Sequence, residues 1–342
     1  MDPPREYNAI ILPEYNSNLI RALRNLKVEK RKIRLPQDDE VLIKVIASPC
    51  NPSDIAFIQG GYNIVKPLPA IPGFEGTGKV IKTGKFSEAR RLMGKMVSFF
   101  SQDPHGGTWA EYVTTRARNC IITRNDLPPE QSACLFVNPL TAYALYDIVR
   151  KKKARSIIMN AAAGQIGIFI QKLARNDDIT IINIVRKDKH IAYLKSLGEK
   201  IVINQAEENF ETTLWALSED MQPSVALDAI AGEMTGKLFN NMPGGSEIIT
   251  YGGLSGAQIS GIDPLGLIFG RKKLSGFNLN DWLGKLSRSR LDEIATHLQE
   301  LIIRQEIRTR VQAKSGLEDH NELLMKYMRN MSDGKVLFFP DH

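Results

Sequence analysis

Residues 157–167 read IIMNAAAGQIG, and this short stretch decides the fold class of the 342-residue chain. An apolar run stops at Asn160, small residues follow, and an apolar segment with helical spacing begins after Gly164. Small residues let the backbone approach a phosphate closely, and the start of a helix offers N–H groups and the positive end of its dipole to negative charge. The stretch therefore predicts a dinucleotide-binding turn that places Ala163, Gly164, Gln165 and Ile166 against the phosphates.

The turn departs from the usual G-x-G-x-x-G pattern, because Ala161 or Ala162 stands where the first glycine is expected. Its context supplies what the bare motif lacks. Short apolar runs, which we read as strands at residues 156–160, 179–185, 201–204, 225–229, 247–250 and 273–277, alternate with amphipathic helical segments. Strands that alternate with helices in this way are typical of βαβ units, so we expect a Rossmann domain with a doubly wound parallel sheet.

The region before residue 128 has a different texture. It is rich in proline and contains short β-branched and aromatic runs, for example residues 41–47 and 94–101, which indicate a compact β-rich domain. After an amphipathic helix at residues 291–305, the chain ends in an edge-like strand at residues 334–339 that could return to the first domain. We therefore expect an α/β protein with a β-rich domain at residues 1–128, a Rossmann domain at 129–280 and a returning segment at 281–342.

Composition excludes several classes of protein. The net charge is +7, but the basic residues are scattered and lack interleaved aromatics, which argues against a nucleic-acid partner. No apolar run reaches the roughly 18 residues of a membrane helix, and the N-terminus has no secretory pattern. The three cysteines are widely spaced, as in proteins of a reducing compartment. We expect a cytoplasmic protein that has no membrane partner.

The residues after the second expected Rossmann strand indicate which dinucleotide binds. Arg186, Lys187 and Lys189 follow that strand, and Arg186 lies 22 residues after Gly164. An acidic residue near this position would bind the ribose hydroxyl of NAD, whereas arginine accommodates the 2′-phosphate of NADP. The sequence therefore favours NADPH, although Arg186 could also be an ordinary surface charge.

Several short motifs along nearly the whole chain resemble the medium-chain dehydrogenase/reductase superfamily, in particular its zinc-free branch of quinone oxidoreductases and 2-enoyl thioester reductases. They are NPSD at residues 51–54, QGGY at 59–62, PGFEG at 72–76, GTW at 107–109, VNPLTAY at 137–143 and YGG at 251–253. The resemblance implies a GroES-like catalytic domain, built from the N-terminal region and the tail, around an inserted Rossmann domain. It also implies an active site between the two domains and a homodimer, for which the apolar segment 259–269 is a candidate edge.

The resemblance further implies catalysis without zinc. Zinc-dependent members have Cys where this chain has Asn51 and His where it has Phe74, and neither residue present can bind zinc. We expect no metal. A proton must then come from a side chain, and Tyr62 matches the tyrosine that enoyl thioester reductases use as proton donor. Without the flanking motif, a tyrosine in a loop rich in Gly and Pro is more often a surface or lid residue.

The same resemblance assigns residues around the cofactor and the substrate. Asn51, Asp54 and Trp282 are expected at the substrate pocket, although Asp54 could instead bond its own loop and Trp282 could belong to the core. Asn138 and Thr141 are expected beside the nicotinamide and ribose, with helix capping as the alternative. Further residues expected along the cofactor are Tyr251, Gly252, Gly253, Leu254, Phe277, Leu279 and Lys335, the last reaching the 2′-phosphate or ribose.

Three functions remain open at this point. The leading one is NADPH-dependent reduction of an electron-poor C=C, first of all in a 2-enoyl thioester, with Tyr62 protonating the neighbouring carbon. The second is an NADPH:quinone or small-enone reductase, which has no need of the Tyr62 hydroxyl. The third is a protein that binds NADPH without catalysis.

Overall fold

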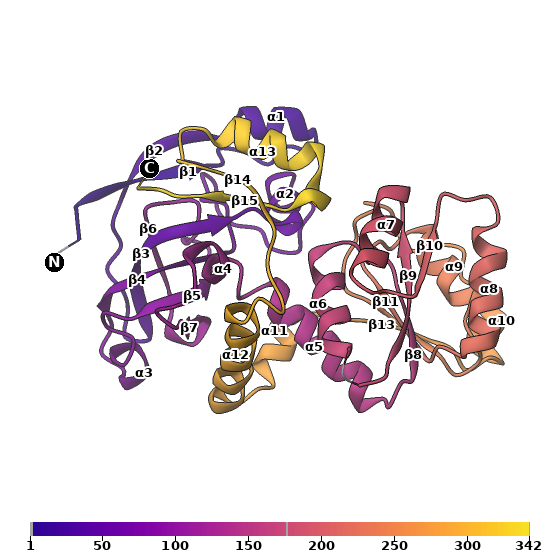
Figure 1. Ribbon diagram of the computed structural model, residues 1–342. Helices are drawn as coiled ribbons and strands as arrows, with labels where there is room; N and C mark the ends of the chain where they lie inside the picture. The colour runs from indigo at the N-terminus through magenta and orange to yellow at the C-terminus, as the bar shows by residue number, and fades with distance from the viewer. Residues whose placement is uncertain (1–2, 176, 342) are drawn as a thin grey trace. The chain divides into compact units, whose positions relative to one another are not determined.

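A computed structural model describes residues 3–175 and 177–341 of the chain (Figure 1). The chain divides into two compact units. Unit 1 comprises the described residues up to Pro139 together with those from Ser287 onward, and unit 2 runs from Leu140 to Leu286. Within the described ranges, no helix is both long and apolar enough to cross a membrane.

Unit 1 is built around a seven-stranded sheet with strand order β14-β15-β3-β4-β5-β7, in which β6 pairs with β3. A separate antiparallel pair, β1 and β2, packs beside it. The strands are β1 (Glu6–Ile11), β2 (Lys27–Lys32), β3 (Glu40–Pro49), β4 (Glu75–Thr83), β5 (Met96–Phe100), β6 (Tyr112–Arg116), β7 (Cys120–Ile122), β14 (Val311–Ser315) and β15 (Lys335–Phe338). The helices are α1 (Leu19–Arg24), α2 (Pro52–Ile58), α3 (Ser87–Arg90), α4 (Pro129–Ala133), α12 (Arg288–Ile303) and α13 (His320–Arg329), with short 3₁₀ turns at Ala117–Asn119 and Met331–Asp333.

The C-terminal strand joins the first part of the chain, as expected from its sequence. Leu337 and Phe338 of β15 pair antiparallel with Pro49 and Ser48 of β3. The expectation of an edge strand is wrong, because β14, which the sequence analysis missed, pairs with the other side of β15. This interior position explains why all four residues of β15 are buried: both sides of the strand are covered by neighbouring strands.

Unit 2 has the parallel sheet that the alternation predicts. Its strand order is β10-β9-β8-β11-β12-β13, and every pairing is parallel. The strands are β8 (Ser156–Met159), β9 (Thr180–Val185), β10 (Ile201–Asn204), β11 (Val225–Asp228), β12 (Glu247–Thr250) and β13 (Lys273–Gly276). The helices are α5 (Asn138–Lys151), whose first two residues belong to unit 1, α6 (Gln165–Ala174), α7 (Asp188–Ser196), α8 (Phe210–Met221), α9 (Glu233–Asn241), α10 (Pro264–Ile268) and α11 (Leu279–Gly284).

Counted along the chain, this strand order is 3-2-1-4-5-6, which is that of the doubly wound dinucleotide-binding fold. Helices α5 and α6 cover one face of the sheet, and α8 and α9 cover the other (Figure 1). On the second face, Phe210 and Leu214 of α8 and Leu238 of α9 pack with Ile158 and Ile182 of the sheet. The order reverses direction between β8 and β11, so the carboxyl ends of these two strands form the crevice in which such sheets bind ligands.

Candidate active site

The turn between β8 and α6 lies at that crevice. Ala161 has a φ of +48°, the left-handed conformation that a glycine adopts at this place without strain. Gly167 leaves no room for a side chain, because a Cβ there would lie 2.4 Å from the Ala162 carbonyl oxygen. The chain therefore follows the expected path of strand, tight turn and helix. In this turn Ala161 adopts a left-handed conformation that is more usual for glycine.

The basic residues expected at the 2′-phosphate follow the strand next to β8. Arg186 is exposed directly after β9, Lys187 is the residue before α7, and Lys189 lies in the first turn of that helix. Ile157 of β8 lies opposite Ile181 of the parallel strand β9, so the carboxyl ends of both strands lie on the same side of the sheet. The folded unit thus brings Arg186 to the same carboxyl end of the sheet as the turn that is expected to bind the phosphates.

The remaining residues expected at the cofactor in unit 2 follow the next strands at the same edge. Residues 251–254, which include Tyr251, Gly252, Gly253 and Leu254, come directly after β12, Phe277 comes after β13, and Leu279 begins α11. A Cβ on Gly252 would lie 2.8 Å from the Ala229 carbonyl oxygen, so this loop approaches the one after β11 closely. Burial, followed by the charge of Asp228, raises the pKa of the Tyr251 phenol well above its ordinary value.

Thr141 and Trp282 are carried by helices of unit 2, and Asn138 begins α5 within unit 1. Thr141 is buried, and the half-buried Trp282 ring lies 6.4 Å from the Tyr143 ring between centroids. Asn278, the residue before α11, caps that helix by accepting hydrogen bonds from the Asn280 and Asp281 N–H groups. This contact accounts for an asparagine at position 278.

A buried polar cluster joins the start of α2 to β4 and β15 in unit 1. The Asn51 side-chain amide donates a 2.8 Å hydrogen bond to Glu75 Oε1, and the Val137 N–H donates a 2.8 Å bond to Glu75 Oε2. The Lys335 ammonium donates to Asn51 Oδ1 and, at 3.4 Å, to the Cys50 carbonyl. Burial raises the pKa of Glu75, while Lys335 and these hydrogen bonds oppose the rise.

Lys335, which was expected at the cofactor, donates a hydrogen bond from its ammonium to Asn51 inside unit 1. Glu75 was not proposed as a site residue, although it lies in the PGFEG motif. Its only signal in the sequence was its place in that motif, since β4 itself mixes apolar residues with threonines and lysines.

Asp54 lies in the first turn of α2 and is fully buried. Its Oδ2 accepts a 2.7 Å hydrogen bond from the Asn51 N–H, which is the loop-bonding role left open by the sequence. Its Oδ1 has no hydrogen-bond partner among the described residues. Burial raises the pKa of Asp54 to about 7, despite the opposing influence of the Asn51 N–H and Lys335.

Tyr62 is half-buried after α2, and its ring packs against Phe74 with 5.4 Å between centroids. Burial first, and the Asp54 charge second, raise the pKa of the phenol, while a hydrogen bond with the Gln102 side chain acts in the opposite direction. The phenol is therefore kept protonated in a partly apolar setting. Such a group can donate a proton to an incipient carbanion.

Lys66 was missed by the sequence analysis. It is only 2% exposed, and its ammonium lies 5.4 Å from the Phe57 ring centroid and 5.5 Å from that of Phe74. Backbone carbonyl groups of Ile71 and Gly106 accept its hydrogen bonds, and burial lowers its pKa to about 8. A lone lysine in a loop gives no signal of burial, because the apolar rings around it come from distant parts of the chain.

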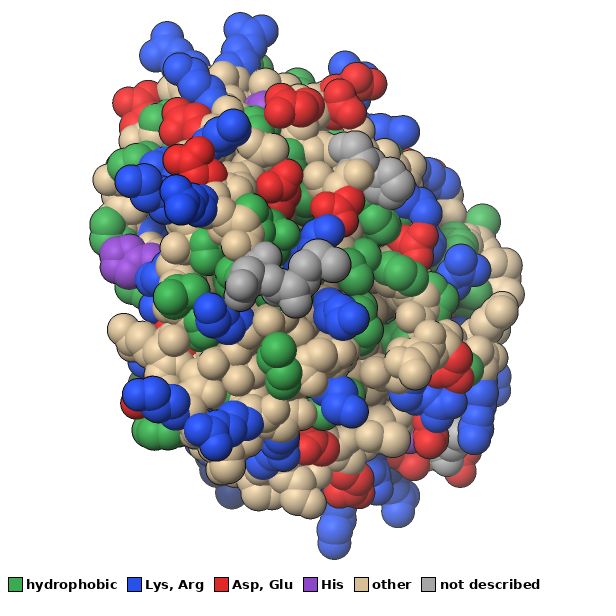
Figure 2. Space-filling model, turned by 90° about the vertical axis from the view of Figure 1, so that its left-hand side faces the viewer, with side chains coloured by type: hydrophobic (Ala, Val, Ile, Leu, Met, Phe, Trp, Pro, Cys, Tyr) green, Lys and Arg blue, Asp and Glu red, His purple; other side chains and the backbone are tan. Residues whose placement is uncertain are grey.

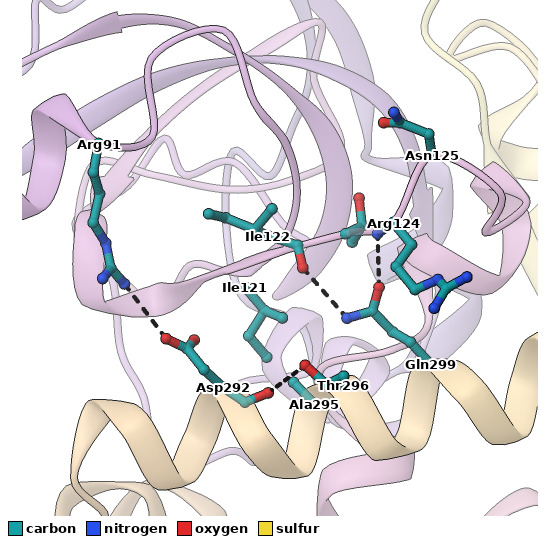
Figure 3. A pocket seen from close by; sticks show the side chains of 10 residues that line it. Arg91, Ile121, Ile122, Arg124, Asn125, Asp292, Ala295, Thr296 and Gln299 are labelled. Atoms are coloured by element: carbon teal, nitrogen blue, oxygen red, sulfur yellow. Dashed lines mark hydrogen bonds and ion pairs between the residues drawn. The ribbon is translucent and has the colours of Figure 1, made fainter.

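The described residues contain no group of three His, Cys, Asp or Glu side chains placed to hold a metal ion. A cavity of about 480 Å³ lies elsewhere in unit 1, between β7 with its following turn and helix α12 (Figure 3). Gln299 spans it, accepting a 2.8 Å bond from the Arg124 N–H and donating to the Ile122 carbonyl at 3.3 Å. None of the residues proposed for the site lines this cavity.

Lys and Arg side chains are interspersed with Asp and Glu over the face shown in Figure 2. Most ion pairs among the described residues join partly exposed side chains, such as Lys44 with Asp341 and Arg124 with Asp126. Exposed pairs of this kind contribute little to stability. The interspersed positive and negative side chains on this face agree with the scattered basic residues seen in the sequence.

Comparisons with known proteins give a consistent picture. Residues 37–125 match the family described as the alcohol dehydrogenase GroES-like domain. The chain is 30% identical to the mitochondrial enoyl-[acyl-carrier-protein] reductase of Homo sapiens over 318 residues, covering 91% of this chain and 84% of that protein. The corresponding protein of Xenopus tropicalis is 29% identical over 284 residues, covering 82% and 80% of the two chains. A crystal structure of a "putative NADPH:quinone reductase" from Mesorhizobium loti matches with a TM-score of 0.92 and 32% identity, covering 99% of this chain and 100% of that one.

Proposed function

Because the chain belongs to the zinc-free quinone oxidoreductase and 2-enoyl thioester reductase branch of the medium-chain dehydrogenase/reductase superfamily, and is thus an NADPH-dependent reductase, we propose that it reduces the C=C bond of a 2-enoyl thioester. The observation that carries this choice is Tyr62, a half-buried phenol kept protonated by burial and by Asp54. An enoyl thioester needs a proton on the carbon next to its carbonyl, and the phenol has one to give. The mitochondrial enoyl reductases among the relatives support the same substrate class.

We assign NADPH binding to unit 2 and proton donation to unit 1. The edge formed by the ends of β8, β9 and β12 supports the first assignment, because the turn at Gly164 fits a pyrophosphate and Arg186 fits a 2′-phosphate. When bound, NADPH supplies the hydride for the reaction.

In the proposed mechanism, the Tyr62 O–H bond breaks as a C–H bond forms at the α-carbon of the thioester. The phenolate that remains is reprotonated from solvent, and the nearby Asp54 charge favours this return because it disfavours a second negative charge. Gln102, which hydrogen-bonds the phenol, orients it for transfer. Asn51, held between Lys335 and Glu75, forms a fixed polar wall beside Asp54.

Quinone reduction is the second candidate, favoured by the 32% identity to the Mesorhizobium loti protein. Steady-state NADPH oxidation with crotonyl-CoA and with 1,4-benzoquinone, measured on the same preparation, separates the two. We expect turnover of crotonyl-CoA. Turnover of the quinone with no NADPH oxidation on crotonyl-CoA would replace the proposal by its alternative.

We also propose a homodimer formed through unit 2 and a cytoplasmic location. Ile268 and Phe269 are 65% and 76% exposed beside the edge strand β13, an arrangement suited to a second copy of the chain. The three cysteines are free and buried, as expected for a reducing compartment. Relatives named as mitochondrial make cell fractionation the relevant test of location.

A further inference from the structure

The carboxylate of Asp228 lies fully buried at the end of β11. Its Oδ1 accepts three hydrogen bonds: from the Asn160 amide at 2.6 Å, the Ile230 N–H at 2.9 Å and the Ala231 N–H at 3.1 Å. A buried carboxylate needs such donors because it has lost its water. One oxygen atom of Asp228 thus binds both Asn160, the residue that follows β8, and the loop that follows β11.

Asn160 completes this link from the other side. Its side-chain oxygen accepts a 2.8 Å hydrogen bond from the Ala229 N–H, while its amide donates to Asp228. Both ends of one side chain therefore bind β11 and its loop. Asn160 directly precedes the phosphate-binding turn, so its position sets where that turn begins.

The second carboxylate oxygen extends the link to a third element. Oδ2 accepts a 2.6 Å bond from the Thr235 hydroxyl of α9 and a 3.4 Å bond from the Thr250 hydroxyl at the end of β12. The loop after β12 is in turn bonded to the loop after β11, since the Leu254 N–H donates to the Ala229 carbonyl at 3.0 Å. Asp228, at the end of β11, thus forms side-chain hydrogen bonds with residues at the ends of both neighbouring strands, β8 and β12.

The backbone next to these hydrogen bonds is strained. Ala161 and Ala231 have φ values of +48° and +62°, a region that costs free energy for residues with a Cβ. Ala161 directly follows Asn160, and the Ala231 N–H binds Asp228. The hydrogen bonds of the buried Asp228 carboxylate thus lie next to both strained residues and oppose their relaxation to a lower-energy backbone conformation.

We propose that Asp228 is a positioning residue of the NADPH site, which fixes the phosphate-binding turn relative to the loops after β11 and β12 by holding Asn160. The proposal rests on the proposed function and adds to it a residue that acts through others. Preorganised N–H groups bind an anion well only while their spacing is kept, so loss of the Asp228 carboxylate should weaken binding of the pyrophosphate. The adenosine part, bound near Arg186, depends less on this spacing.

Titration calorimetry with two ligands tests the proposal. NADPH contains the pyrophosphate, whereas adenosine 2′,5′-bisphosphate keeps the 2′-phosphate and lacks the pyrophosphate bridge. For Asp228→Ala we expect the Kd of NADPH to rise at least about tenfold, and that of the bisphosphate less than threefold. The KM for NADPH should rise in step, with kcat changing much less.

Two matched variants separate positioning from general destabilisation. Asp228→Asn keeps an oxygen for the three N–H donors and offers an amide to the two hydroxyls, which can turn to accept, so NADPH affinity should stay within about threefold of the wild type. Thr235→Val removes one hydrogen bond to the same carboxylate, but from helix α9 rather than from the loops at the site. It should lower the melting temperature without changing the Kd of NADPH. If Asp228→Ala does not fold, Asn160→Val cuts the same link and should give the same ligand-selective loss.

The outcomes are distinct. A folded Asp228→Ala or Asn160→Val protein that binds NADPH as tightly as the wild type overturns the proposal, as does an equal loss for both ligands. A wild-type protein that binds NADPH but reduces no enoyl thioester overturns the proposed function and leaves the positioning role intact.

Discussion

The Tyr62 ring packs against the Phe74 ring, with centroids 5.4 Å apart and ring planes inclined by 31°. Phe74 is itself part of the buried core of unit 1, so it provides a fixed wall for the phenol. The contact holds the ring without using the hydroxyl, which hydrogen-bonds the Gln102 side chain and, in the proposed mechanism, donates its proton to the substrate. Loss of the hydroxyl can therefore be separated from loss of the ring.

Tyr62→Phe should keep this packing and remove the proton donor. We expect kcat with crotonyl-CoA to fall by about 10²–10⁴-fold, the usual contribution of a positioned acid, with little change in melting temperature. Quinone turnover should be unaffected. Tyr15→Phe is the matched control: it removes a hydroxyl that bonds the Lys66 backbone in the same core, and should lower stability while sparing kcat. Equal kcat for Tyr62→Phe and wild type would remove Tyr62 from the mechanism.

Asp54 should make stability depend on pH in a defined direction. Its pKa is raised from 3.8 to about 7 on folding, so its contribution to stability is full below about pH 4 and is lost as the pH rises through about 7. Asp54→Asn has no such proton. The free energy of unfolding of the variant, relative to wild type, should therefore rise by on the order of 2–4 kcal/mol between about pH 4 and pH 8. Urea unfolding of the variant and the wild type, compared at each pH across this range, measures the difference.

Arg186 should select the phosphorylated cofactor. Replacement by alanine removes a charge at the edge of unit 2 and should raise the KM for NADPH by about tenfold or more while leaving that for NADH nearly unchanged. The effect should shrink as salt is added, because the guanidinium is exposed. Lys195→Ala, on the exposed face of α7, is the control. Loss of both cofactors to the same extent would argue against a contact with the 2′-phosphate.

Ala161→Gly should relieve backbone strain in the phosphate-binding turn. The left-handed φ of +48° costs an alanine about 1–2 kcal/mol, part of which returns as the greater entropy of glycine in the unfolded chain. We expect a net gain of about 1 kcal/mol or less in the free energy of unfolding, with NADPH affinity retained. Ala162→Gly, at a neighbouring position without positive φ, should instead destabilise the protein. Calorimetric melting of both variants tests the difference.

Phe269 should contribute to the proposed dimer. It is 76% exposed, and replacing it by serine should raise the dimer dissociation constant without lowering the melting temperature of the monomer. Phe86→Ser removes an exposed ring of unit 1 and should leave the dimer unchanged. Light scattering over a range of protein concentrations gives the answer. A wild-type monomer at micromolar concentration would exclude the dimer.

Local patterns in the sequence were sufficient for unit 2. The bounds expected for β10 and β12 agree with the structure residue for residue, and those of β8, β9, β11 and β13 differ by a single residue at one end. This success has a physical basis, because the interior strands β8, β9 and β11 are buried apolar runs between amphipathic helices and carry their own signal. The turn at Gly164 and the basic residues after β9 were visible for the same reason.

Non-local pairing limited the prediction for unit 1. The sequence analysis recognised the final strand but not β14, which covers its second side, because β14 is a short segment, Val311–Ser315, with a mixed burial pattern. In the same way, Lys66 gave no sign of its burial among Phe57, Phe74 and distant carbonyl groups.

The sequence by itself determined the two kinds of domain, the NADPH preference and the tyrosine to test, because each depends on residues that are close together along the chain or on recognisable motifs. Only the tertiary structure decided which buried charges meet. It joined Lys335 to Asn51 across 284 positions and Asn160 to Asp228 across 68. Such contacts follow from the register of strands that are far apart in sequence, and burial then gives each polar group a free-energy cost that only its actual partners offset.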